Sequence, residues 1–181
     1  MSITFEISCR IINVEDNMSE KELLTKKFIN VDMNDAQIST IEKPIIGTDA
    51  LATCRGVLLY SEEKKVAIVA HVSCDEYVVM DTINKIFKII VDNKLYGVKF
   101  KYKIFPGYYP EDHYGITLIL EKYFADFMPF GDEELLGNVI NRDDATESCC
   151  FAFDASSGRF VTDKVFFGLD YYSVNGNGQA R

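Results

Sequence analysis

Hydrophobic and polar side chains alternate with the period of a β-strand in several parts of the chain. In residues 3–11 every second position is apolar, which predicts a strand with one buried face. Residues 51–60 and 65–73 are largely apolar on both faces and flank the polar residues 61–64, so they predict a hairpin with a four-residue loop. Two apolar faces are typical of a sheet that is covered on both sides.

Two segments have the features of helices. Apolar residues recur at helical intervals between residues 79 and 90, and Ser73 and Glu76 have the spacing of a capping box just before them. Residues 19–29 contain another capping box and predict a shorter helix. The first of these two segments has the clearer helical period.

The second half of the chain continues the mixture of elements. Residues 98–105 alternate apolar side chains with lysines and predict a strand that ends before a Pro-Gly pair. Residues 113–127 fit either a strand or a helix, and we favour a strand at their start. Residues 148–168 predict two strands joined by a turn at residues 156–158.

Three segments lack a long regular pattern. Residues 30–47 show no steady period and predict a loop, whereas residues 131–148 are acidic and polar and predict at most a short helix at residues 132–140. Residues 173–181 are rich in glycine and asparagine and predict a flexible tail. The strands and helices together favour a single α/β sandwich domain.

The composition is typical of a globular protein, and the net charge is strongly negative. The 181 residues are 48% hydrophobic and 26% charged, and 28 acidic against 19 basic side chains give a net charge of -9. This charge repels phosphate backbones and anionic lipid surfaces, so we expect no nucleic-acid partner. The N-terminus lacks the pattern of a secretion signal and no run approaches the ~20 apolar residues of a spanning helix. We therefore expect no membrane insertion and a cytoplasmic location in the producing cell.

The cysteine content points to a reducing compartment. The chain has five cysteines, an odd number, and they are mostly far apart along the sequence. This argues against a disulfide framework. In a reducing compartment a cysteine is either a small buried hydrophobe or a nucleophile.

Cys54 and His71 lie on the two strands of the predicted hairpin. If residues 61–64 form its loop, the antiparallel register places Cys54 directly opposite His71, with Cβ atoms ~5 Å apart. A one-residue slip would place the two side chains on opposite faces. An imidazole beside a thiol lowers the thiol pKa and carries the proton to a leaving group, which suits attack on an amide. Thr48, at the mouth of the hairpin, is a candidate to hold the imidazole ring.

Each of these residues also has a purely structural interpretation. Cys54 would be a small core residue, His71 a buried imidazole bonded to a backbone carbonyl, and Thr48 an ordinary loop residue. A zinc site on His71 and Cys74 is disfavoured, because residues three apart on a strand face opposite sides and the chain has no CxxC pair. We expect neither a metal nor an organic cofactor.

The spacing of Thr48, Cys54 and His71 resembles the Thr, Cys and His signature of the chemoreceptor glutamine deamidase family, CheD. The stretch "TCRGVLLYSEEKKVAIVAHV" is similar to the family's apolar strand, polar turn and second strand that carries the histidine. Farther along, "FAFDASSGRF" is similar to its closing hairpin. The resemblance covers residues 45–162 and extends, in the same core, to Cys and His deamidase toxins such as the cytotoxic necrotizing factors.

The resemblance implies an α/β/α-type sandwich around a mainly antiparallel or mixed sheet. It implies one CheD-like domain over residues 1–172, with residues 1–47 as an extended N-terminal segment and residues 173–181 as the tail. The sequence departs from the family at "DALATC", where the family has the glycine-rich "GxGSC", and at "HVSC". The missing glycines restrict the backbone where amide donors would stabilise an oxyanion.

The resemblance also implies the chemistry. We expect a protein glutamine deamidase in which Cys54 is the nucleophile, His71 the base and Thr48 the group that orients it, acting on a partner protein with an accessible glutamine. The long N-terminal segment favours a bacterial toxin or effector translocated into a host cell over a chemotaxis enzyme that modifies chemoreceptors. A catalytically silent, CheD-like binding module, and a cysteine peptidase or transglutaminase, are the alternatives.

Overall fold

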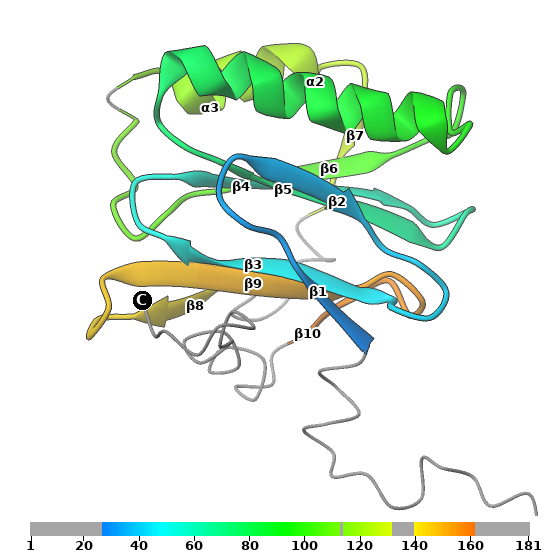
Figure 1. The fold of residues 1–181 in the computed structure, drawn as a ribbon, viewed down its shortest axis with the longest axis horizontal. Coiled ribbons are helices and arrows are strands. Elements are labelled where there is room, and N and C mark those ends of the chain that lie inside the picture. The colour runs from blue at the N-terminus through cyan, green and yellow to red at the C-terminus, as the bar shows by residue number, and fades with distance from the viewer. Residues whose placement is uncertain (1–26, 113, 132–139, 162–181) are drawn as a thin grey trace, which may run out of the picture.

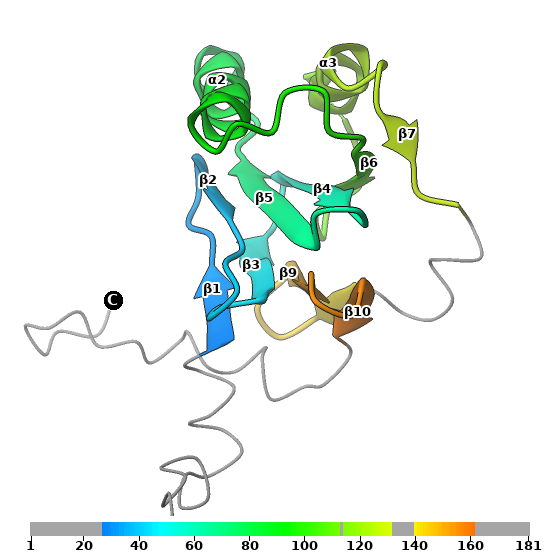
Figure 2. The same ribbon diagram turned by 90° about the vertical axis from the view of Figure 1, so that its right-hand side faces the viewer.

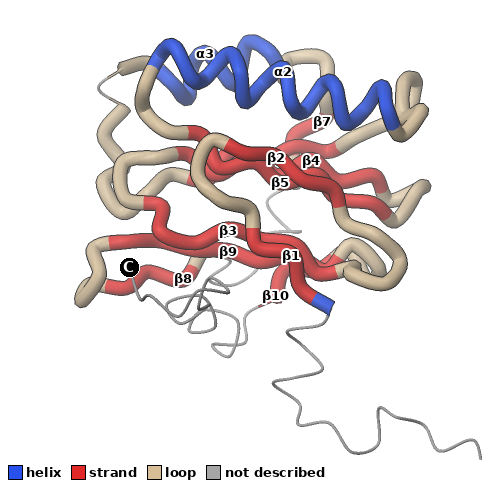
Figure 3. The backbone as a smooth tube through the Cα atoms, viewed as in Figure 1, coloured by secondary structure: helices blue, strands red, loops and turns tan. Residues whose placement is uncertain are grey.

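The computed structural model describes residues 27–112, 114–131 and 140–161, which form three layers. Two sheets of five strands pack face to face, and two helices cover the outer face of one sheet (Figure 1). A view turned by 90° shows the same order of sheet, sheet and helices (Figure 2). The α/β class and the mixed sheets of the sequence prediction are confirmed. The other outer layer is a sheet rather than helices in the described residues (Figure 3).

The outer sheet has the strand order β1-β3-β9-β10, with β8 also paired to β9. The pair β1 and β3 is parallel, and the other pairs are antiparallel. The strands are β1 (Phe28–Asn30), β3 (Ile45–Leu51), β8 (Asn141–Asp143), β9 (Ser148–Asp154) and β10 (Arg159–Val161).

The inner sheet has the strand order β2-β5-β4-β6-β7 and is antiparallel except between β6 and β7. Every residue of β4 is buried, because one face of this sheet packs on the outer sheet and the other on the helices. The strands are β2 (Asp35–Ile38), β4 (Arg55–Ser61), β5 (Val66–Val72), β6 (Lys101–Phe105) and β7 (Met128–Pro129).

The two helices, α2 (Glu76–Asp92) and α3 (Ile116–Tyr123), pack side by side over the inner sheet (Figure 2). The apolar face of α2 is buried at Val79, Ile83 and Ile86, as its periodicity predicts. Its N-cap is Asp75, whose side chain accepts a hydrogen bond from the Tyr77 backbone N–H, and not the predicted Ser73. Among the described residues, neither helix is long and apolar enough to cross a membrane.

Two cores follow from this layering. Residues such as Leu58 and Val69 fill the space between the sheets, whereas Val57 and Ala70 face the helices. Alternation along β5 places His71 on the same side as Val69, between the two sheets. This side of β5 is where the candidate site lies.

The hairpin of β4 and β5 is confirmed, with a correction to its register. Its loop has four residues as predicted but consists of residues 62–65, so that Ser61 pairs with Val66. Lys65 adopts a left-handed conformation with φ of 51°, and no glycine or asparagine marks that turn in the sequence. Moving the loop by one residue shifts the register by two, so the residue opposite His71 is Gly56 rather than Cys54.

Other element boundaries differ from the prediction. Residues 30–47 contain the end of β1, all of β2 and the start of β3 instead of a loop. β1 and β2 are edge strands too short to show a period, and only the first residues of β3 fall in this range. Residues 52–54 link β3 to β4 and are not strand. The two strands predicted at the start of residues 148–168 are confirmed as β9 and β10.

The expected strand at the start of residues 113–127 is wrong, because residues 116–123 form the helix α3. The Asp112 carboxylate accepts hydrogen bonds from the backbone N–H groups of Ile116 and Thr117, and Ile116 and Leu120 bury one helical face. Tertiary burial and this cap outweigh the strand preference of the β-branched residues. Several predictions lie outside the described residues: the strand at 3–11, the helix at 19–29 up to residue 26, the short helix at 132–140 up to residue 139, the end of the strand pair from residue 162, and the tail. The predicted helix is wrong at residues 28 and 29, which belong to β1.

Candidate functional site

A hydrogen bond between Thr48 and His71 joins the two sheets. Thr48 Oγ1, on β3, lies 2.8 Å from His71 Nδ1, on β5. The same hydroxyl donates to the Val31 carbonyl at 2.7 Å. Thr48 and His71 are both buried, and the expected contact of an orienting group with the imidazole is present.

These two contacts assign the tautomer of His71. A threonine hydroxyl has one proton, and a carbonyl only accepts, so that proton is committed to Val31. Thr48 Oγ1 must therefore accept from Nδ1–H of His71. In the neutral ring this leaves Nε2 as a bare acceptor, which is the state that a general base requires.

His71 Nε2 is buried and has no hydrogen-bond partner among the described residues. Burial also lowers the pKa of His71 from 6.5 to about 4, because a charged imidazolium would lose its hydration there. The ring is neutral at physiological pH and holds an unused lone pair between the sheets. An unpaired buried acceptor costs about 1–3 kcal/mol, so it marks a place where function can outweigh stability.

Cys54 lies just before β4, on the same side of the inner sheet as His71. This residue is part of the core between the sheets and is 7% exposed. Because Gly56 is the residue opposite His71, Cys54 is displaced by two positions along the strand, a diagonal relationship. The predicted direct pairing is thus wrong, while the predicted common face is kept. The thiol does not hydrogen-bond Nε2.

The thiol of Cys54 is protonated at neutral pH. Burial raises its pKa above the ordinary 9.0, and the neighbouring Cys74 acts in the same direction. Arg55 and the backbone N–H groups of Cys74 and Cys54 act in the opposite direction, by favouring the thiolate. The lowered thiol pKa expected from the sequence is therefore absent in the free protein.

Ser73 is a residue of this site that the sequence reasoning missed. Within the part of the chain that the structure describes, its buried hydroxyl has no hydrogen-bond partner, and the same is true of Nε2 of His71, two residues earlier. Continuing the register of β4 and β5 by one pair sets Ser73 opposite Cys54. Period-2 counting from His71 also reaches Ser73, whereas its spacing from Glu76 is that of a capping box and favours a helix cap.

Arg55 holds the chain on either side of Cys54. Its side chain is buried, and all five of its N–H donors are used: Nε donates to Thr117 Oγ1, Nη1 to the carbonyls of Thr53 and Cys54, and Nη2 to those of Pro110 and Glu111. Asp112 adds an ion pair at 3.7 Å. Arg55 therefore fixes the segment before β4 against the segment that leads to α3.

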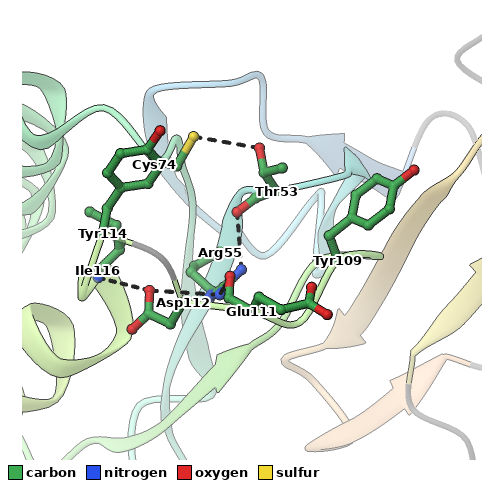
Figure 4. A pocket seen from close by; sticks show the side chains of 8 residues that line it. All are labelled: Thr53, Arg55, Cys74, Tyr109, Glu111, Asp112, Tyr114 and Ile116. Carbon is green, nitrogen blue, oxygen red and sulfur yellow. Dashed lines mark hydrogen bonds and ion pairs between the residues drawn. The ribbon is translucent and has the colours of Figure 1, made fainter.

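A cavity of about 150 Å³ opens beside this arginine (Figure 4). Cys74 and Thr53 meet at its rim, with the sulfur 3.5 Å from the hydroxyl. Neither Cys54 nor His71 lines the cavity, but both sequence neighbours of Cys54 do. The residues that line it are Thr53, Arg55, Cys74, Tyr109, Glu111, Asp112, Tyr114 and Ile116.

Within the described parts of the chain, no three His, Cys, Asp or Glu side chains are grouped so that they could hold a metal ion. The catalytic roles of Cys54, His71 and Thr48 stay predictions, although two of the three residues are in hydrogen-bond contact. No protein-family model matches the chain, and no curated protein matches its sequence.

Proposed function

We propose that this protein is a protein glutamine deamidase of the CheD type, with Cys54 as nucleophile, His71 as general base and Thr48 as the residue that orients the base. The observation that carries the proposal is the hydrogen bond from His71 Nδ1–H to Thr48, which leaves Nε2 as an unpartnered buried acceptor on the face that also carries Cys54. The spacing of the three residues in the sequence supports the same assignment.

The reaction starts from a neutral thiol and a neutral imidazole. Cys54 Sγ attacks the carboxamide carbon of the substrate glutamine, and the thiol proton passes to His71 Nε2. The imidazolium then gives this proton to the amide nitrogen, the C–N bond breaks, and ammonia leaves a thioester on Cys54. Water, deprotonated by His71, hydrolyses the thioester to glutamate and restores the thiol.

Cys54 Sγ and His71 Nε2 must approach one another for this proton transfer, because no hydrogen bond joins them in the free protein. A rotation of the Cys54 side chain on substrate binding would shorten the diagonal separation. Catalytic contacts are often longer before substrate binds, so the free geometry is compatible with this role.

Ser73 is suited to serve as an oxyanion donor, a role that the family's glycine-rich segment supports and that this sequence lacks glycines for. Its buried hydroxyl has no hydrogen-bond partner within the described residues, so its proton is available to donate to the carboxamide oxygen as negative charge develops. The backbone N–H groups of Cys54 and Cys74 favour negative charge at the sulfur.

A binding module is the second candidate, favoured by the low exposure of Cys54 and by its raised thiol pKa. In that case the sandwich would bind a partner protein without modifying it. The partner of an active enzyme would be a chemoreceptor or a host protein, as in the families that the sequence resembles. Deamidation would give the partner a new negative charge.

The two candidates are separated by peptide mass spectrometry. Wild type, Cys54→Ser and the control Cys150→Ser are incubated with bacterial and host-cell lysates, and conversion of glutamine to glutamate is scored at each site. We expect site-specific conversion by wild type and Cys150→Ser, and none by Cys54→Ser. Identical results for wild type and Cys54→Ser would refute the enzyme.

A further inference from the structure

The cavity beside Arg55 has a close structural connection to the proposed nucleophile. Thr53 and Arg55, which flank Cys54 in the chain, form part of its wall. The guanidinium of Arg55 also donates to the Cys54 carbonyl at 3.2 Å. A side chain held in the cavity would therefore belong to a residue close to the one that reaches Cys54.

The wall of the cavity is held in place before any ligand binds. The backbone N–H groups of Tyr108 and Tyr109 donate to the carbonyls of Leu51 and Ala52 at 2.9 and 3.0 Å. Gly107 packs so tightly on this turn that an added Cβ would lie 2.2 Å from the Ala52 oxygen. A binding site formed in advance loses less entropy when a ligand binds.

Arg55 is not available to bind an anion in this cavity. All five of its N–H groups already donate to protein oxygens, four of which are backbone carbonyls. A carboxylate or phosphate would have to break these bonds to gain a partner. The lining offers no lysine or second arginine in its place.

The remaining groups favour a cation. Glu111 has an exposed side chain and forms no ion pair within the described residues, whereas the Asp112 carboxylate is used by Arg55 and by the start of α3. Tyr109 and Tyr114, 40% and 67% exposed, stand at opposite sides of the cavity (Figure 4). Aromatic rings beside a carboxylate bind ammonium and guanidinium groups through cation–π and Coulomb attraction.

We infer that this cavity is a specificity subsite that binds a lysine or arginine side chain next to the target glutamine of a partner protein. The inference rests on the proposed deamidase function and adds a substrate class to it: glutamines flanked by a basic residue. The net charge of -9 would attract basic partner segments to the site before contact.

The subsite is tested by binding, separately from catalysis. The Cys54→Ala variant of the full chain, labelled with ¹⁵N, is titrated with two acetylated tripeptide amides and followed by NMR. One peptide has lysine on both sides of glutamine, and the other has norleucine at the same positions. We expect the lysine peptide to bind about tenfold more tightly and to shift the amide signals of the lining residues.

Two charge variants locate the effect. Glu111→Gln should reduce the preference for lysine to about threefold or less, whereas Glu121→Gln, the same change of charge on the exposed face of α3, should leave it unchanged. Equal binding of the two peptides, binding of neither, or the same loss in both variants would overturn the inference. Selective binding without any conversion of glutamine by wild type would refute the deamidase and leave the subsite standing.

Discussion

Thr48 Oγ1 accepts a hydrogen bond from His71 Nδ1 at 2.8 Å, from one sheet to the other. The hydroxyl keeps its own proton for the Val31 carbonyl, so the three groups form a fixed chain from β5 through β3 to the segment after β1. This chain determines which nitrogen of His71 is free. The chemistry proposed for the site depends on that nitrogen.

Replacing Thr48 by valine keeps the volume and removes both hydrogen bonds. The Val31 carbonyl and His71 Nδ1 would be left buried and unpaired, so we expect the free energy of unfolding to fall by about 1–3 kcal/mol. The rate of deamidation should fall roughly 10²-fold, because the imidazole loses its orientation. Urea unfolding and mass spectrometry of the product measure the two effects.

Thr48→Ser is the matched control, since it retains the hydroxyl. We expect it to keep most of the activity. The ¹⁵N chemical shifts of the His71 ring report the tautomer directly and should show Nδ1–H in wild type and in Thr48→Ser, but a mixture in Thr48→Val. The same tautomer in all three proteins would show that Thr48 does not orient the ring.

The acid limb of the pH profile of the proposed deamidase reaction should reflect the low pKa of His71. The base must be neutral to accept the thiol proton, and burial lowers the pKa of His71 to about 4. We therefore expect kcat/KM to stay constant from pH 7 down to about pH 5 and to fall only near pH 4. An acid limb near pH 6.5, the ordinary value for histidine, would contradict this account of the free enzyme.

The same pKa predicts how stability depends on pH. Below pH 6.5 the unfolded chain binds a proton at His71, whereas the folded protein does not until about pH 4. Protonation thus favours the unfolded state, and His71 should lower the free energy of unfolding by about 3 kcal/mol as the pH falls through this window. His71→Asn lacks this titration. Urea unfolding of both proteins at pH 7.5 and 4.5 should show a smaller loss for His71→Asn, and parallel losses would be evidence against a buried neutral imidazole.

Replacing Arg55 should lower the free energy of unfolding more than replacing an exposed arginine. In Arg55→Gln the carbonyls that Arg55 binds lose a charged donor, and we expect the free energy of unfolding to fall by about 3 kcal/mol or more. Hydrogen exchange in residues 106–112 should also become faster. The control Arg159→Gln changes an exposed side chain, and its unfolding free energy should stay within about 0.5 kcal/mol of wild type. Equal effects of the two substitutions would show that the Arg55 cluster contributes no net stability.

Local patterns were sufficient for the main elements around the site. The hairpin of β4 and β5, the helix α2 and the hairpin of β9 and β10 follow from periodicity and turn residues. The register of the hairpin of β4 and β5 could not be predicted in this way, because its left-handed residue is Lys65, and lysine seldom marks such a turn. The predicted register differs from the observed one by two residues. An even shift keeps side chains on the same face, so Cys54 and His71 still share a face.

The helix α3 and the strands within residues 30–47 needed tertiary information. The α3 segment is rich in residues that suit a strand, and the cap by Asp112 together with burial of Ile116 and Leu120 decides for a helix. The short strands β1 and β2 exist because neighbouring strands offer them hydrogen bonds, which no pattern in their own residues reveals.

The sequence by itself determined which residues we propose as catalytic and, through the alternation of strands, that Cys54 and His71 face the same side. Alternation is a local property of the backbone, so it can be counted along the chain. Only the tertiary structure decided that β3 packs over β5 and joins Thr48 to His71, and that Arg55 builds a cavity from residues far along the chain. It also decided that Nε2 of His71 and the Ser73 hydroxyl have no hydrogen-bond partner among the described residues. These relationships arise where separate elements pack together, and their energies depend on burial that no single segment determines.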